Sequence, residues 1–126
     1  MRNIIIPAVL FILVITFVAL NLFYITDNAA RLDAILVSAS DAAENGDFEE
    51  ATAEVERFKE EFSAVGKYLF AVIQHNEVDD VIFSSNRLLA LCNADTKEQF
   101  LSEIEVTRES IKLIRDAEIP YLENIL

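Results

Sequence analysis

The side chains best suited to chemistry lie in the stretch His75-Asn76-Glu77-Val78-Asp79-Asp80. One imidazole and three carboxylates are gathered there, and His75 and Asp79 share a face if a single helix runs through both. Oxygen ligands of this type suit Ca²⁺ or Mg²⁺, but the stretch lacks the glycine-bearing loop of an EF-hand. A single histidine also excludes the repeated Glu-x-x-His pattern of di-iron bundles. His75, Glu77, Asp79 and Asp80 therefore form a candidate cation cluster.

The same residues also fit an acidic helix start. Carboxylates in the first turn interact favourably with the helix dipole, and Asn76 is a suitable N-cap for a helix that contains Glu77, Asp79 and Asp80 in its first turn. Acidic first turns are common, so we favour this structural interpretation. We expect no metal ion and no other cofactor.

The one cysteine, Cys92, excludes an intrachain disulfide and a zinc site built from thiolates. It lies on an apolar stripe, which predicts a packed structural thiol, with disulfide-linked dimerisation as the functional alternative. The sequence contains no Gly-rich phosphate loop, no serine elbow and no other catalytic motif. We therefore expect that the protein is not an enzyme.

The charge of the chain limits its partners. Twenty-two acidic residues against ten Lys and Arg give a formal net charge of −12. Such a surface repels phosphate backbones, so we expect no nucleic-acid partner. The chain has only 2 Gly and 2 Pro, which argues against a turn-rich β architecture and favours an all-α fold.

The element that must position everything else is residues 4–25, which hold no charged side chain. At about 1.5 Å per residue these 22 residues span roughly 33 Å, enough to cross a hydrocarbon core of about 30 Å. We predict an N-terminal membrane anchor over residues 1–25. The residues of this anchor include Ile4, Pro7, Phe11, Phe17, Phe23 and Ile25.

A cleaved signal peptide is the competing interpretation of the same stretch. Its apolar region would be about 7–15 residues long and would end in a small-x-small site, whereas this run is longer and residues 26–30 match such a site poorly. Arg2 and the α-amino group precede the stretch, and Arg31 follows it. The positive-inside rule therefore predicts a single-pass protein of the cell membrane with a cytoplasmic N-terminus and an extracytoplasmic domain.

Residues 26–126 are predicted to form one acidic helical domain, with helices at about 27–44, 48–75, 77–93 and 97–119. No Pro or Gly separates the first of these from the anchor, so the two should be continuous. Asn45-Gly46-Asp47 is expected to form a turn, Thr96 to begin a capping box, and Pro120 to end or kink the last helix. The predicted fold is an antiparallel four-helix bundle whose first helix continues from the membrane span. Four stripes of mostly apolar residues at helical spacing support it: Leu32, Ile35, Leu36, Ala39 and Ala43; Phe48, Ala51, Val55, Phe58, Phe62, Val65, Leu69, Val72 and Ile73; Val78, Val81, Ile82, Ser85, Leu88, Leu89 and Cys92; and Phe100, Leu101, Ile104, Thr107, Ile111, Ile114 and Glu118.

Most phenylalanines of the domain lie on these stripes and are expected in the core. Phe70 and Phe83 lie off the stripes. A long second helix would also return to the membrane and bring Tyr68, Leu69 and Phe70 close to the interface, together with Tyr121. We therefore predict a partner-facing or lipid-facing surface that includes Phe70, Phe83 and Tyr121.

The layout is similar to that of a known family. An anchor, an acidic helical domain, the stretch from His75 to Asp80 and the end Asn124-Ile125-Leu126 resemble domain-of-unknown-function family 4363, small membrane-anchored helical proteins of Firmicutes. The chain departs from the family in its second helix, where Tyr68 or Phe70 replaces a tryptophan. The family has no established activity. Because its members accompany small multi-pass membrane proteins, the resemblance implies an accessory-subunit role.

Two functions follow as hypotheses. The first is a membrane-anchored interaction module that contacts membrane lipid and either another integral membrane protein or a second copy of itself. The alternative is an extracytoplasmic ligand- or cation-sensing four-helix bundle, against which stands the lack of a cytoplasmic output domain before the anchor. A divalent-cation buffer that uses the acidic surface is a third reading.

Overall fold

The computed structural model describes the backbone of residues 2–69 and 75–125, and within it the side chains of residues 3–21, 23–24, 26–65 and 78–116. The fold is all-α, as the sequence predicts. Its elements, in order along the chain, are α1 (Arg2–Glu44), α2 (Phe48–Leu69), α3 (His75–Leu91), a 3₁₀ turn η1 (Ala94–Thr96) and α4 (Lys97–Ile125).

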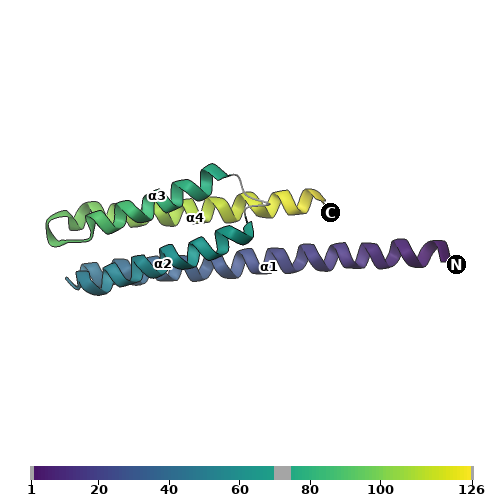
Figure 1. Ribbon diagram of the computed structural model, residues 1–126, viewed down its shortest axis with the longest axis horizontal. Coiled ribbons are helices and arrows are strands. Elements are labelled where there is room, and N and C mark those ends of the chain that lie inside the picture. Colours follow the sequence, from purple (N-terminus) through teal and green to yellow (C-terminus); the bar gives the residue numbers. More distant parts are fainter. Residues whose placement is uncertain (1, 70–74, 126) are drawn as a thin grey trace.

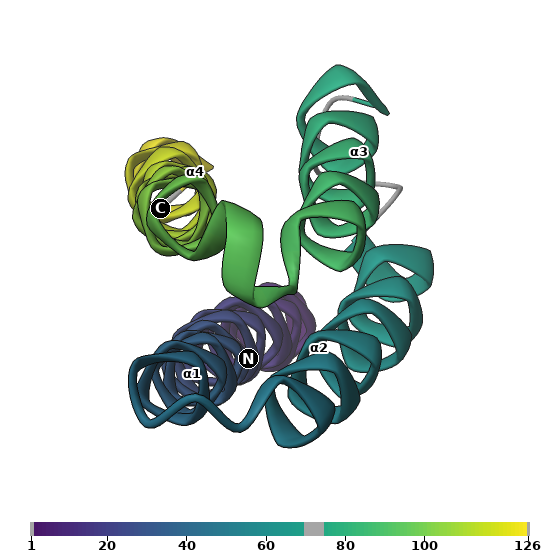
Figure 2. The ribbon, with the colours of Figure 1, turned by 90° about the vertical axis from the view of Figure 1, so that its left-hand side faces the viewer.

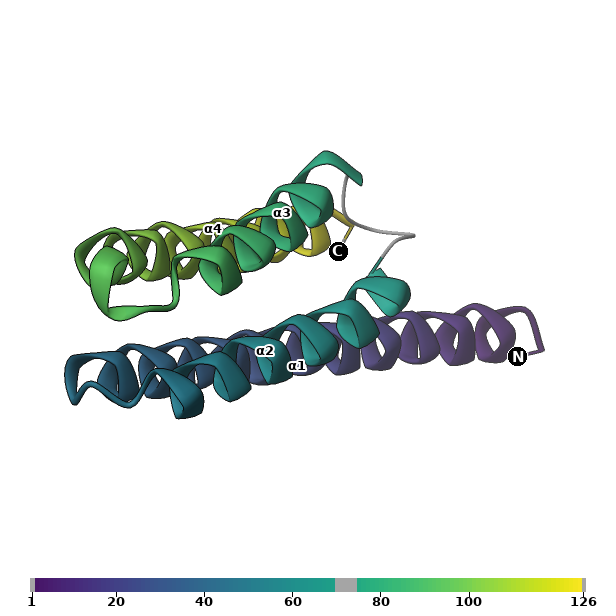
Figure 3. The same cartoon turned by 60° about the vertical axis from the view of Figure 1, so that its left-hand side comes forward.

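The four helices form an up-down-up-down bundle. Each of α1 and α3 packs against both α2 and α4, so the helices stand at the corners of a square when they are viewed end-on (Figure 2). The N-terminal part of α1 runs well beyond the other three helices, on the same side as the end of α4 (Figure 1). The α1–α2 and α3–α4 turns lie together at the opposite end (Figure 3).

Most buried residues of each helix recur at steps of three and four, with one step of seven from Asn21 to Asn28 and an additional buried neighbour at Leu36, Ala43 and Ser84. This 3.5-residue period is typical of helices that pack in the manner of a left-handed coiled coil. The predicted stripes face the core. Their described residues are buried, apart from Phe48, Ile82, Leu89, Cys92 and Leu101, which are partly buried and pack against the core. The stripes that are buried in the structure are Val18, Asn21, Asn28, Leu32, Ile35, Ala39 and Ala42 in α1; Ala51, Val55, Phe58, Phe62 and Val65 in α2; Val78, Val81, Ser85 and Leu88 in α3; and Phe100, Ile104, Thr107, Ile111 and Ile114 in α4.

The α1–α2 turn forms as predicted. Gly46 has φ +80°, and its N–H donates to the Ala43 carbonyl at 3.0 Å while the Asp47 N–H donates to the Ala42 carbonyl at 2.9 Å. This pair of bonds is the Schellman arrangement that satisfies the last carbonyls of a helix. The Asp47 carboxylate then accepts from the Glu50 N–H at 3.1 Å and caps the start of α2.

The α3–α4 turn differs from the prediction. Asn93, and not Thr96, is the cap: its side-chain oxygen accepts from the N–H groups of Asp95 at 3.0 Å and Thr96 at 3.1 Å. The Thr96 hydroxyl instead donates back to the Leu91 carbonyl at 2.6 Å. One 3₁₀ turn therefore precedes α4, because the capping residue lies three positions earlier than the capping-box pattern indicated.

Three predicted helix bounds need correction. His75 opens α3, so it does not end the second helix, and Asn76 lies inside α3 rather than at its N-cap. The third helix ends at Leu91 rather than at about residue 93. The helix α4 continues past Pro120 to Ile125 instead of ending at about residue 119. Proline fixes φ near its helical value and removes one backbone hydrogen bond, and here that loss does not stop the helix. The predicted helical residues 70–74 lie outside the described part of the chain.

Candidate functional site

The N-terminal third of α1 exposes apolar side chains on all sides. Residues 4–17 are exposed without exception, among them Ile4, Pro7, Phe11 and Phe17. In the described part of the chain, α1 is the one helix long and apolar enough to cross a membrane, a test that a signal sequence also passes. The side chain of Ile25 lies outside the described residues.

The bundle begins inside this apolar stretch. Val18 is 4% exposed and Asn21 is also buried, whereas Leu20 and Phe23 on the opposite side of the same turns are 63% and 72% exposed. Asn21 and, seven residues later, Asn28 each donate the side-chain amide to the carbonyl four residues earlier, at 2.8 Å. From residue 18 to 23, α1 therefore packs into the bundle on one face and keeps an apolar face outside.

A groove of about 350 Å³ lies between α1 and α4 just beyond that level, and we call it the α1–α4 groove. At one end, Arg108 of α4 holds Asp33 of α1 with two bonds, Nε to Oδ1 at 2.8 Å and Nη2 to Oδ2 at 3.3 Å. Its Nη1 donates to Glu105 at 3.1 Å. The hydrogen bond with Asp33 is the main cause that raises the pKa of Arg108 above its ordinary value.

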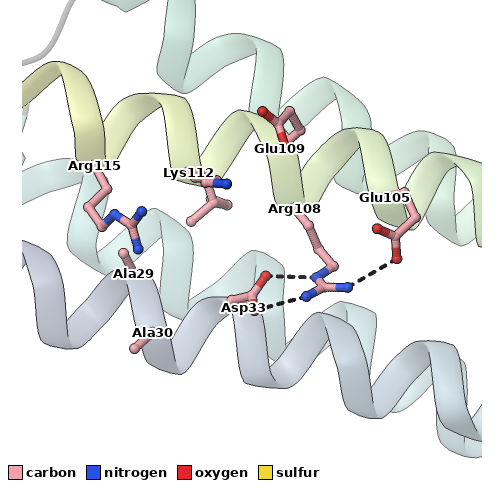
Figure 4. A pocket seen from close by; sticks show the side chains of 9 residues that line it. Ala29, Ala30, Asp33, Glu105, Arg108, Glu109, Lys112 and Arg115 are labelled. Carbon is pink, nitrogen blue, oxygen red and sulfur yellow. Dashed lines mark hydrogen bonds and ion pairs between the residues drawn. The ribbon is translucent and has the colours of Figure 1, made fainter.

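The other end of the groove is less well paired. Arg115 bonds the adjacent Asp116 at 3.0 and 3.1 Å. Lys112 makes no hydrogen bond or ion pair with the residues that the structure describes. Arg108 and Arg115 extend from α4 toward α1, whereas Glu109 points away from it (Figure 4). Lys112 lines the same groove. Ala29 and Ala30 line the α1 side, so small side chains leave the space open.

The predicted cation cluster is described only in part. Asp79 and Asp80 are exposed in the first turns of α3, while the side chains of His75 and Glu77 lie outside the described residues. Asp80 lines a shallow hollow with Ser110, Leu113 and Ile114 of α4. Among the described side chains, no group of three or more His, Cys, Asp and Glu could hold a metal ion.

The predicted partner surface is also only partly described. Phe83 is 64% exposed, and the guanidinium of Arg87 lies 5.2 Å from the centre of its ring. Phe70 lies outside the described residues, and Tyr121 lies in α4 with its side chain not described. Sequence patterns missed two exposed apolar residues of α4, Val106 and Leu113, which are seven positions apart and so share one face.

Ser84 and Cys92 make further polar contacts between elements of the bundle. The Ser84 hydroxyl donates to the Glu103 carboxylate at 2.8 Å and lies 2.6 Å from the Thr107 hydroxyl. Cys92, half-buried against the core, lies 3.3 Å from the Thr52 hydroxyl. Both contacts fix how neighbouring helices pack, and the second places the thiol of Cys92 within the structure of the bundle.

Comparison with known proteins gives one match. A family model described as "Domain of unknown function (DUF4363)" matches residues 19–125. Neither a curated protein nor a solved structure matches the chain. The matched region begins at residue 19, inside the apolar stretch and next to the first buried residue of α1, Val18.

Proposed function

We propose a function from the premise that this chain belongs to the DUF4363 family: it is a membrane-anchored helical interaction module without catalytic activity. Its role is that of an accessory subunit of another membrane protein, or of a subunit that assembles with copies of itself. The part that enters the membrane is residues 4–25, and the acidic bundle stands beside the membrane surface.

The observation that carries this proposal is the continuity of α1. One unbroken helix of 43 residues begins with a fully exposed apolar segment and continues into the buried stripe of the bundle. An exposed apolar surface of this extent is unfavourable in water and suits a lipid or protein partner. Because a rigid helix joins both parts, any partner of the anchor is held at a fixed distance from the bundle.

The buried stripe favours a retained anchor over a cleaved signal peptide. Cleavage near residues 26–30 would remove Val18 and Asn21, both of which are buried in the bundle. It would also remove part of the region that the family model matches. A signal peptide is normally dispensable for the mature fold, whereas these residues contribute to it.

Two features complete the proposal. The Arg2 side of the apolar stretch is placed in the cytoplasm and the bundle outside, as the positive-inside rule predicts. The partner contact is assigned to the large apolar residues that are exposed outside the span, which among the described side chains are Phe83 of α3 and Val106 and Leu113 of α4. Single exposed apolar residues are ordinary, but three on neighbouring helices favour a contact surface.

Membrane extraction tests the anchor. Membranes that contain the full-length protein are washed with alkaline carbonate, and the intact mass of the retained protein is measured. We expect retention with the mass of the complete chain. Leu13→Arg places a charge in the middle of the span, which costs about 3 kcal/mol and should reduce retention. Ala34→Arg, on an exposed position of the bundle, is the matched control. Release of the unmodified protein by carbonate, or a mature mass that lacks the apolar stretch, would contradict the proposal.

The α1–α4 groove gives a reason to retain one second candidate, an extracytoplasmic ligand-sensing bundle. A sensor would change its conformation or stability when the ligand occupies the groove. Thermal unfolding in the presence of small anionic metabolites separates the two functions, because an interaction module requires no such ligand.

A further inference from the structure

The exposed face of α1 indicates where a membrane would end. This face is apolar as far as Phe23, and the first charged side chain after Arg2 is the exposed Asp27. Head groups add about 5–7 Å to each side of the hydrocarbon core. At about 1.5 Å per residue, the turn that follows Asp27 is level with these head groups.

The α1–α4 groove lies at that height. Ala29 and Ala30, which follow Asp27 directly, line the groove together with Lys112 and Arg115 of α4. The groove therefore presents two cationic side chains beside the turn of α1 that is level with the phosphates. The Asp33–Arg108 pair marks the end of the groove farther from the membrane.

The pairing of the basic residues distinguishes this groove from its surroundings. Arg108 is neutralised by Asp33 and Glu105, and Arg31, which is also near this height, is paired with Glu61 of α2 at 2.9 Å. Among the residues that the structure describes, Arg115 is paired with the neighbouring Asp116 alone, and Lys112 has no partner. The chain has a formal net charge of −12, yet Lys112 and Arg115 are not fully paired with acidic residues and lie in a groove that Ala29 and Ala30 also line. This arrangement requires an explanation.

We propose that the α1–α4 groove binds the phosphate of an anionic phospholipid head group through Lys112 and Arg115. The guanidinium fork and the ammonium group are suitable donors to the two non-bridging oxygens of a phosphodiester. Arg108 lies at the far end of the groove and is bonded to the carboxylates of Asp33 and Glu105. Lys112 and Arg115 are therefore the basic residues available to the phosphate. This inference rests on the proposed function, because the membrane anchor brings the lipid to the groove.

Native mass spectrometry of the full-length protein in mild detergent tests the site. Palmitoyl-oleoyl phosphatidylglycerol and the phosphatidylcholine with the same acyl chains are added in turn, and the lipid-bound fraction is measured. We expect phosphatidylglycerol to bind more tightly by roughly tenfold or more, as two basic groups near a membrane surface predict. The variant K112Q/R115Q should lose this preference, and Lys112→Arg should keep it.

The matched control is R57Q/K59Q. Like K112Q/R115Q it removes two positive charges, but from α2, close to Glu61. It should bind both lipids as the original chain does. Equal binding of the two lipids, or equal loss of the preference in both double variants, would overturn the proposal. Displacement of phosphatidylglycerol by millimolar inorganic phosphate would overturn the assignment to lipid and identify a free phosphate site instead.

Carbonate extraction of the same variants separates this inference from the proposed function. K112Q/R115Q should remain in the membrane like the original chain, because the span carries the anchoring. If the original chain stays in the membrane but binds both lipids equally, the lipid site in the groove is refuted and the proposed function is not. Loss of the original chain from the membrane refutes the proposed function on which the groove depends.

Discussion

Arg108 of α4 holds both carboxylate oxygens of Asp33 in α1, although the two residues are 75 positions apart in the chain. The bond joins the last helix to the helix that carries the apolar span. Near this level the same two helices also share a small cavity lined by Leu32 of α1 with Ile111 and Ile114 of α4. Lys112 and Arg115 line the adjoining groove with Ala29 and Ala30.

Removal of this ion pair should cost little stability but should be measurable as a coupling. Both side chains are about a third or more exposed, so a double-mutant cycle of Asp33→Asn and Arg108→Gln should give a coupling of about 0.5–1 kcal/mol in chemical denaturation. The value should fall in 1 M salt because screening weakens exposed charges. The Glu54–Arg57 pair, at 3.7 Å, is the control and should give less. A larger coupling across Glu54–Arg57 would contradict the account.

The coupling energy between Asp33 and Arg108 should not change between about pH 6 and pH 10. The pKa of Arg108 is raised in the folded protein, so the stability that this group contributes is fully present below its unfolded pKa. It would be lost only when the pH rises through the still higher folded pKa. Denaturation midpoints of the cycle across this range are the measurement, and a coupling that disappears near neutral pH would show that another group carries it.

Replacement of Asn28 by valine should stabilise the bundle by about 1 kcal/mol. Asn28 is 8% exposed, and its one hydrogen bond goes to the Tyr24 carbonyl, which leaves the side-chain oxygen without a partner in the described structure. The cavity that Asn28 lines is apolar apart from Arg115, with Leu32, Phe62, Ile111 and Ile114 among its lining residues. Thermal unfolding of the variant tests this, and a loss of stability would mean that the amide has a function in specifying how the helices align.

Gly46→Ala should destabilise the protein by about 1 kcal/mol through the backbone alone. Gly46 has φ +80°, and an added Cβ would meet nothing within 4 Å, so no clash contributes. Gly46→Asn should cost less, because asparagine adopts the left-handed conformation more readily. Urea denaturation of both variants ranks them, and equal losses would indicate that conformation is not the cause.

Two phenylalanines should respond in opposite ways to truncation. Phe100 is fully buried, so Phe100→Ala should cost about 3–5 kcal/mol in stability. Phe83→Ala should change stability by less than about 0.5 kcal/mol, since the ring is exposed and contacts Arg87. Chemical denaturation of each variant gives the comparison. A large stability loss for Phe83→Ala would remove this residue as a partner contact and assign it a structural role.

The sequence predicts the helices and their buried faces well because those faces repeat at helical spacing. The stripe from Ala51 to Val65 in α2 is an example, since charged residues fill its opposite face. Local chemistry also predicts the Gly46–Asp47 turn, whose bonds lie within a few residues. These features depend on neighbours in the chain, which a single sequence contains.

Features that depend on distant residues are not predictable in this way. Nothing local indicates that Asp33 meets Arg108, because the contact follows from how α1 packs on α4. The groove likewise exists only once α1 and α4 are side by side. Two local patterns were also misleading: Asn93 provides the cap in place of a capping box at Thr96, and α4 does not end at Pro120.

The most direct measurement is purification of the full-length protein from its native membranes into nanodiscs, followed by mass photometry and mass spectrometry. The account predicts a stoichiometric complex with another membrane protein or with a second copy of the chain. It also predicts that F83S/L113S weakens this complex without unfolding the bundle. Recovery of the original protein alone, as a monomer in the membrane, would contradict the interaction module.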